Sequence, residues 1–178
     1  MAATEEMLAI ACRHRPHAAC LVPEKRQEVT TEGGLDVAGQ TAELGRTVTT
    51  LADAGVRVSL FVDPEPAQLE AAARIGAPVV ELHTGAYCEA HLADPDSPET
   101  AREFDRIAAG ARTAARLGLE CHAGHGLSYA SVKPVAALEQ VVELNIGHFL
   151  IGEAVFVGLE AAVRRMRALM DEARQTPA

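Results

Sequence analysis

The sequence contains no tryptophan and few other aromatic residues, so its core must be built from smaller aliphatic side chains. Aromatic residues make up 3% of the 178 positions, whereas apolar residues make up 48%. A core of alanine, valine, leucine and isoleucine is typical of helices packed against a parallel sheet. The length suits one domain, and we expect residues 1–178 to fold as a single unit.

Basic clusters and long apolar segments are also missing. The chain carries 25 acidic residues against 16 Lys and Arg residues, which gives a formal net charge of −9. An acidic chain without a basic block is not expected to bind nucleic acid. No apolar run is long enough to cross a bilayer, and no signal-peptide pattern opens the chain. We therefore expect a cytoplasmic protein that has no membrane partner.

Cysteine is scarce, and its four residues form no C-x-x-C motif. Cys12, Cys20 and Cys121 lie in apolar surroundings, which predicts buried free thiols in a reducing compartment. Cys88 falls in a polar segment that we expect to be a loop, where its thiol can be exposed.

A helix followed by a glycine and a strand recurs three times. Gly55, Gly76 and Gly118 separate predicted helices from predicted strands, and such recurrence is typical of β/α repeats. The pattern predicts five strands, over residues 17–22, 56–62, 78–83, 119–125 and 143–151. It predicts six helices, one that opens with Thr4 as its N-cap, then residues 35–54, 64–75, 99–117 and 132–141, and one that follows Gly152.

This alternation predicts the α/β class, and five β/α units correspond to the last five-eighths of a (β/α)8 barrel. An eight-stranded barrel typically needs about 250 residues, so the barrel would be incomplete in this sequence. The alternative is an open doubly wound sheet. That fold usually carries a glycine-rich fingerprint after its first strand, and the sequence has none.

Polar residues stand at the carboxyl ends of the predicted strands, where parallel α/β folds place their chemistry. Strand alternation turns Glu81 and His83 toward a barrel interior. On the next strand, Cys121, Ala123 and His125 share one face. A carboxylate inside a barrel is costly unless it is paired or used, so Glu81 and His125 are candidate catalytic residues. The alternatives are a structural ion pair for Glu81 and a surface turn for His125.

Glycines near the last two strands indicate phosphate binding. The loops after strands seven and eight of a barrel often bind phosphate together with a helix N-terminus. Here these loops correspond to Gly124–Gly126 and to Gly147 and His148, which precede the last helix. A bulge with a packed histidine is the alternative interpretation of Gly147 and His148.

The segment Pro23–Gly34 is a long polar loop, and loops of that length in compact domains are usually functional or disordered. Within it, Thr30, Thr31, Lys25 and Arg26 offer contacts of the kind that a phosphate group needs. The alternative is a solvated loop with no role in binding.

Glu81, His125 and His148 also have the side-chain types of metal ligands. They come from three different predicted strands and show none of the spacings that identify a metal motif. We therefore expect no metal.

Four segments carry a family resemblance. They are LVPEKRQEVTTEGGLD at residues 21–36, ELHTG at 81–85, AGHGL at 123–127 and ELNIGH at 143–148. Together they resemble the pyridoxine 5′-phosphate synthase family of vitamin B6 biosynthesis, and the resemblance runs from Met1 to the end. It implies a (β/α)8 barrel that condenses 3-amino-2-oxopropyl phosphate with 1-deoxy-D-xylulose 5-phosphate, releasing phosphate and water. The two substrates form a Schiff base with each other, so no cofactor is implied.

The resemblance also implies roles for individual residues. His125 resembles the proton donor of the family, and Glu81 resembles its transition-state stabiliser. The segment 23–34 resembles a lid that excludes water. Residues similar to substrate contacts are Thr30 and Gly126 for the deoxyxylulose phosphate, and Gly147 and His148 for the amino-oxopropyl phosphate.

Family members carry roughly three further β/α units before the matching part, with two proton acceptors and most of one substrate pocket. The resemblance therefore implies that the 178-residue chain alone has little or no synthase activity. It also implies a homo-oligomer, which is an octamer in the family. Two alternatives stay open: a non-catalytic phosphate-binding half-barrel, and another phosphosugar enzyme such as an isomerase.

Overall fold

A computed structural model describes residues 1–23 and 33–175, and it has an α/β fold built on one parallel sheet. The strands are β1 (Ala18–Leu21), β2 (Arg57–Val62), β3 (Val79–His83), β4 (Glu120–Gly124) and β5 (Val141–Asn145). They lie in the order β1-β2-β3-β4-β5, and each neighbouring pair is parallel. The five strands predicted from the repeat are therefore confirmed.

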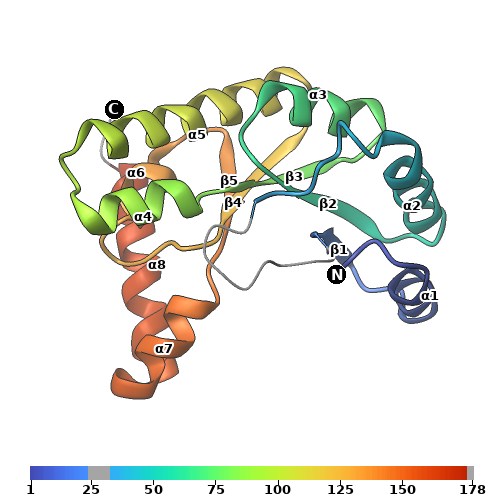
Figure 1. Cartoon of the computed structure of the whole chain (residues 1–178). Coiled ribbons are helices and arrows are strands. Elements are labelled where there is room, and N and C mark those ends of the chain that lie inside the picture. Colours follow the sequence, from blue (N-terminus) through green and yellow to red (C-terminus); the bar gives the residue numbers. More distant parts are fainter. Residues whose placement is uncertain (24–32, 176–178) are drawn as a thin grey trace.

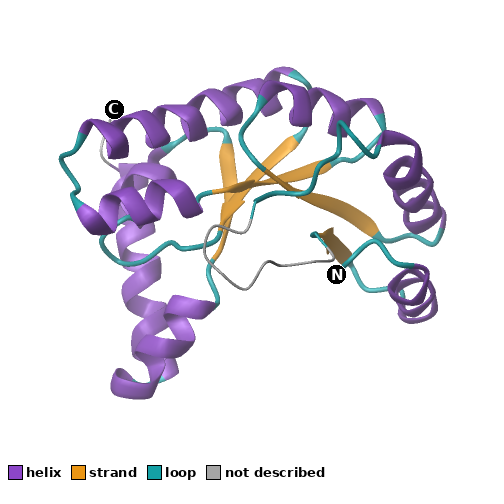
Figure 2. Cartoon of the chain, viewed as in Figure 1, coloured by secondary structure: helices purple, strands orange, loops and turns teal. Residues whose placement is uncertain are grey.

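The helices mostly lie between consecutive strands and pack on one face of the sheet. They are α1 (Glu5–His14), α2 (Thr41–Asp53), α3 (Pro66–Arg74), α4 (Gly85–Ala93), α5 (Pro98–Arg116), α6 (Val132–Ala137), α7 (His148–Val157) and α8 (Leu159–Gln175). Figures 1 and 2 show α2, α3 and α5 along this face, whereas α7 and α8 stand together beyond β5. Residues 24–32, which include Thr30 and most of the predicted lid, lie outside the described residues.

The helix boundaries follow from capping groups that the sequence supplies. The Thr4 hydroxyl accepts a hydrogen bond from the Met7 N–H and caps α1, and Ser97 caps α5 in the same way. Gly55, Gly76 and Gly118 follow α2, α3 and α5 with φ of 78°, 81° and 76°. Left-handed backbone of this kind is cheap for glycine, which is why each predicted glycine stop is confirmed.

Alternate residues of each strand point toward the helices and form the core. In β2 these are Val58, Leu60 and Val62, all buried. The opposite face of the sheet carries polar side chains instead, among them Ser59 and Glu81. The largest fully buried residues include Leu21, Leu44, Leu51, Leu60, Leu69, Leu82 and Ile107. This division sends most of the apolar side chains to one face and leaves the other face for chemistry.

The helix predicted over residues 35–54 begins later than expected, at Thr41. The Leu35 N–H donates to the Phe61 carbonyl at 2.7 Å, and the Val37 N–H donates to the Gln68 side-chain oxygen at 2.8 Å. These bonds tie the segment to β2 and α3, so its backbone groups are satisfied without a helix.

The loop predicted between residues 84 and 98 contains a helix, α4. The helix was not recognised from sequence because its apolar residues do not form a stripe along one side. Cys88 lies on α4 and is buried, so the prediction of an exposed thiol is wrong. Its Sγ lies 3.8 Å from the Ser131 hydroxyl and 3.9 Å from that of Thr84.

The last strand is shorter than predicted: β5 ends at Asn145, and residues 148–157 form α7. Gly158, with φ of 86°, separates α7 from α8. On α8, Leu159 and Val163 are exposed, whereas Met166 is buried. The helix α7 buries none of its residues. Within the described residues, no helix combines the length and apolar character needed to cross a bilayer.

We expect Leu60→Ala to lower the free energy of unfolding by about 2–5 kcal/mol, because it removes a fully buried side chain from β2 and leaves a cavity. The matched control is Leu92→Ala on α4, where the leucine is 87% exposed and the change should stay within about 0.5 kcal/mol. Urea unfolding of both variants measures the difference. Equal losses would contradict this assignment of the core.

Candidate active site

The pairing of β3 with β4 determines which side chains share a face. Glu81 lies opposite His122, and Leu82 lies opposite Ala123. Partners in adjacent strands project to the same side of a sheet, so His122 joins Glu81 on the polar face. Cys121 and Ala123 pair with Val80 and Leu82 and belong to the apolar core. Grouping His125 with Cys121 and Ala123 on one face was therefore wrong.

His125 reaches the polar face because the strand alternation ends before it. β4 ends at Gly124, and His125 has φ of 77°, which lies in the left-handed region. Its ring packs against that of His83, with centroids 5.0 Å apart, and against Phe61 at 6.0 Å. Phe61 lies opposite Glu81 in the sheet. The two predicted catalytic residues thus lie on the same face of the sheet, and both neighbour Phe61.

The turn around His125 is fixed by Thr84, which follows β3. The Thr84 hydroxyl lies 2.8 Å from the Gly124 carbonyl oxygen and 2.6 Å from that of His125. The Thr84 N–H also donates to the Gly124 carbonyl at 2.9 Å. Glycine at position 126, with φ of 85°, lets the chain leave the turn close to Cys88.

Glu81 lies half-buried on the polar face, and its Oε2 accepts two hydrogen bonds. The Asn145 amide donates to this oxygen at 2.9 Å, and the Cys20 thiol donates at 3.7 Å. Burial raises the pKa of Glu81 above its usual value, although the two hydrogen bonds and the nearby His122 act in the opposite direction. The other oxygen, Oε1, lies over Gly124, where an added Cβ would come within 2.4 Å.

His83 is buried beside this carboxylate and is oriented by Asp63. Its Nδ1 lies 3.1 Å from Asp63 Oδ1. The hydrogen bond from His83 lowers the pKa of Asp63. Within the described residues, His83 Nε2 is buried without a hydrogen-bond partner. The role of Asp63 was missed from sequence, although its place directly after β2 was a usable signal.

A second polar cluster lies at the amino-terminal end of the same face. Arg57 binds Glu120 through two hydrogen bonds of 2.8 and 2.7 Å. His122 Nε2 lies 2.8 Å from Glu120, and its Nδ1 lies 3.4 Å from Glu143. The Arg57 hydrogen bond, followed by that of His122, lowers the pKa of Glu120 to about 2. This cluster pairs its charges and does not extend to His125.

The remaining predicted site residues occupy the same edge of the sheet, except Thr30, which is outside the described residues. Gly126 is exposed next to His125. Gly147 and His148 are exposed at the start of α7, two residues beyond Asn145. Their roles as phosphate contacts stay predictions. No group of three His, Cys, Asp or Glu residues in the described part of the chain is placed to hold a metal ion.

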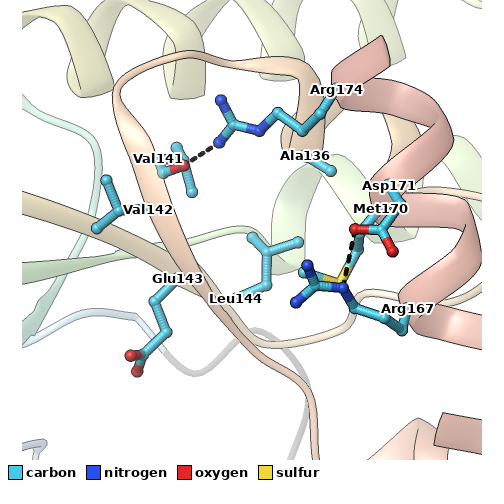
Figure 3. A pocket seen from close by; sticks show the side chains of 9 residues that line it. All are labelled: Ala136, Val141, Val142, Glu143, Leu144, Arg167, Met170, Asp171 and Arg174. Carbon is cyan, nitrogen blue, oxygen red and sulfur yellow. Dashed lines mark hydrogen bonds and ion pairs between the residues drawn. The ribbon is translucent and has the colours of Figure 1, made fainter. Parts of the chain in front are cut away.

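A pocket between β5 and α8 lies away from these groups. Figure 3 shows Arg174 donating to the Val141 carbonyl and Arg167 pairing with Asp171, while the Glu143 side chain points away from both arginines. The residues that line this pocket are Ala136, Val141, Val142, Glu143, Leu144, Arg167, Met170, Asp171 and Arg174. None of the predicted site residues lines it, so we do not regard it as the active site.

Comparison with known proteins identifies the family. The model of a family described as pyridoxal phosphate biosynthesis protein PdxJ matches residues 1–172. The chain belongs to this family. The PdxJ match covers all five strands and confirms the resemblance that the four sequence segments indicated.

Curated relatives in this family are named pyridoxine 5′-phosphate synthase. Those of Rhodospirillum rubrum, Xanthobacter autotrophicus and Jannaschia sp. are 65%, 62% and 61% identical to the chain. The alignments cover 97%, 98% and 98% of this chain, and 68%, 67% and 70% of those relatives. The chain thus spans about two thirds of their length, and their name indicates an enzyme of vitamin B6 biosynthesis.

We expect Gly124→Ala to cost about 1–3 kcal/mol of stability, because the new Cβ would lie 2.4 Å from Glu81 Oε1 and 2.8 Å from the Asn145 carbonyl oxygen. The matched control is Gly152→Ala in α7, where no heavy atom lies within 4 Å and helix propensity predicts a gain of up to about 1 kcal/mol. Urea unfolding distinguishes the two. Similar stability of both variants would show that the carboxylate does not occupy this space.

The Arg57–Glu120 pair predicts a pH-dependent contribution to stability. The pKa of Glu120 falls from its ordinary value of 4.5 to about 2 in the folded chain, so ionised Glu120 stabilises the fold above pH 4.5. That contribution is lost as the pH falls toward 2. We expect the destabilisation caused by Glu120→Gln to shrink over this range. The side chain is 36% exposed, so screening should hold the effect below about 1 kcal/mol.

The control for this measurement is Arg57→Gln combined with Glu120→Gln. If the pair causes the pH dependence, the destabilisation caused by Glu120→Gln should vary less between pH 5 and pH 2 in the Arg57→Gln background than in the unmodified chain. An unchanged pH dependence in the Arg57→Gln background would assign the effect to His122 instead.

Proposed function

We propose that this chain is part of a pyridoxine 5′-phosphate synthase. The reaction condenses 3-amino-2-oxopropyl phosphate with 1-deoxy-D-xylulose 5-phosphate and yields pyridoxine 5′-phosphate, one phosphate and two waters. The observation that carries the proposal is the placement of Glu81 and His125 on the same polar face, both next to Phe61, within a chain that belongs to the PdxJ family. No cofactor is required, because the substrates form a Schiff base with each other.

We propose that Glu81 stabilises positive charge on the developing Schiff base and that His125 donates a proton to a departing oxygen. A half-buried carboxylate interacts more strongly with such a charge than one in water. His125 is exposed at the strand end, where a substrate can reach it. In this proposal Thr30 and Gly126 contact the deoxyxylulose phosphate. Gly147 and His148, next to the start of α7, contact the other phosphate.

We further propose that the five β/α units form the last part of a (β/α)8 barrel, folded as one domain. The polar face supports this idea, because Cys20 of β1 and Asn145 of β5 both contact Glu81 of β3, although one strand lies between each pair. Side chains that meet in this way are expected where a sheet curls inward. The segment 23–34 would then be a lid over the barrel mouth.

The proposed function is tested by measuring pyridoxine 5′-phosphate formation by this chain and by a form extended to the full length of its relatives. We expect little activity from the 178-residue chain, since each proton-transfer group contributes about 10²–10⁴-fold and the family's acceptors have no counterpart here. The extended form should be active. Absence of product from both forms, or turnover of a single phosphosugar, would contradict the proposal.

In the extended form, we expect Glu81→Gln to lower kcat by roughly 10²–10³-fold, because the neutral amide cannot balance the developing charge. The matched control is Glu139→Gln, an exposed residue in the turn between α6 and β5, which should retain full activity. Steady-state kinetics with both substrates measures the effect. Equal activity of the two variants would remove Glu81 from the mechanism.

We also propose a homo-oligomer, with a second copy of the chain as the partner. The exposed apolar residues of α7 support association, since contiguous apolar surface of this kind marks interaction sites. These residues are Ile151, Val155, Phe156 and Val157. Light scattering of the purified protein tests the proposal, and a monomer at all concentrations would contradict it.

A further inference from the structure

Two side chains from opposite edges of the sheet converge on a single oxygen of Glu81. Asn145 of β5 donates to Oε2 at 2.9 Å, and Cys20 of β1 donates to the same atom at 3.7 Å. Both β1 and β5 are separated from β3 by one intervening strand. Neighbouring strands lie about 4.8 Å apart, so these residues start from positions on the order of 10 Å away in a flat sheet.

Small residues on the intervening strands leave room for both contacts. Cys20 pairs with Ser59 of β2, and Asn145 pairs with Gly124 of β4. A Cβ at position 124 would lie 3.0 Å from the Asn145 Cβ and 2.4 Å from Glu81 Oε1. Any larger side chain there would separate Asn145 from the carboxylate. The arrangement therefore depends on the residue types of at least three strands.

We propose that Asn145 and Cys20 are positioning residues for Glu81, which hold Oε2 and thereby direct Oε1 over Gly124, beside the His125 turn. This inference rests on the proposed function, because it assigns the two residues to the same reaction. Two hydrogen bonds to one carboxylate oxygen restrict the rotation of the group and so fix the position of the other oxygen. An ionised group positioned in advance stabilises a developing charge without reorganising.

Both donors keep their protons at neutral pH. Burial, and next the charge of Glu81, raise the pKa of Cys20 to about 11, so the thiol remains an S–H donor. The amide of Asn145 does not titrate. The titratable groups that face Glu81 from other strands are Cys20, His122 of β4 and Glu143 of β5. Of these, His122 lowers the pKa of Glu81 and Glu143 raises it. Replacing either residue is therefore expected to shift the pKa of Glu81 in the opposite direction.

The first test is the titration of Glu81 in the 178-residue chain, followed by NMR of ¹³C-labelled glutamate carboxyl carbons and assigned with Glu81→Gln. We expect Asn145→Ala and Cys20→Ala to raise the pKa of Glu81, since each removes a bond to the ionised form. Asn145→Asp preserves the shape but replaces the donor with a carboxylate, so it should raise the pKa further than Asn145→Ala. Glu143→Gln should lower it.

The matched control is Cys121→Ala, which removes a buried thiol from the core face of β4 and should leave the titration of Glu81 unchanged. If Asn145 did not hold Oε2, Asn145→Ala would titrate like the unmodified chain. That result would overturn the inference.

The second test uses kinetics of the form extended to the length of the relatives. We expect Asn145→Asp to lower kcat on the order of 10–100-fold with a smaller change in KM, and to move the acidic limb of the kcat/KM profile upward. If the Asn145 variants shift the pKa of Glu81 but leave kcat unchanged, the hydrogen bonds to Glu81 are confirmed. That result would instead contradict the catalytic role of Glu81. The two measurements thus separate failure of this inference from failure of the proposed function.

Discussion

The parallel register between β3 and β4 is the constraint on which the candidate site depends. It sets Glu81 opposite His122 and His83 opposite Gly124. A slip of one residue would exchange the two faces of β4 and bring Cys121 or Ala123 beside the carboxylate. The register is secured by the core, because Val80, Leu82, Cys121 and Ala123 are all buried against the helices. Apolar packing on one face therefore fixes the chemistry on the other.

The polar face is divided into layers with different charge balance. At the amino-terminal end, Arg57 and His122 neutralise Glu120 and lower the pKa of its carboxyl group. In the middle, Glu81 accepts hydrogen bonds from two neutral donors, the Cys20 thiol and the Asn145 amide, and burial raises its pKa. The first carboxylate is committed to a structural pair. The second is hydrogen-bonded to a thiol and an amide rather than to a cation, so it is placed to interact with a positively charged group of a ligand, as the proposed reaction requires.

Much of the fold could be predicted from sequence because its signals are local. The glycines after α2, α3 and α5 and the apolar runs of the strands each act within a few residues. The helix α4 and the first half of α7 were missed because neither helix has an apolar stripe along one side. Residues 35–40 were misassigned because their bonds go to Phe61 and Gln68, which are distant in sequence.

The site was predictable only in part, for a related reason. The residue types of Glu81 and His125, with their places at neighbouring strand ends, identified the pair. The contacts from Asn145 and Cys20 cross intervening strands, and no periodic pattern along one strand reports such a contact. Asp63 was overlooked because its partner, His83, lies on the next strand.

The conformation of His125 links these observations to function. A non-glycine residue in left-handed backbone costs on the order of 1–3 kcal/mol, and glycine would relieve it. With regular strand geometry the ring would continue on the side of Cys121 and Ala123, among the core side chains. The positive φ turns it instead toward His83 and Phe61, and Thr84 holds the strained turn through the carbonyl oxygens of Gly124 and His125. The strain is therefore what moves an imidazole from the core face of the sheet to the face that carries Glu81.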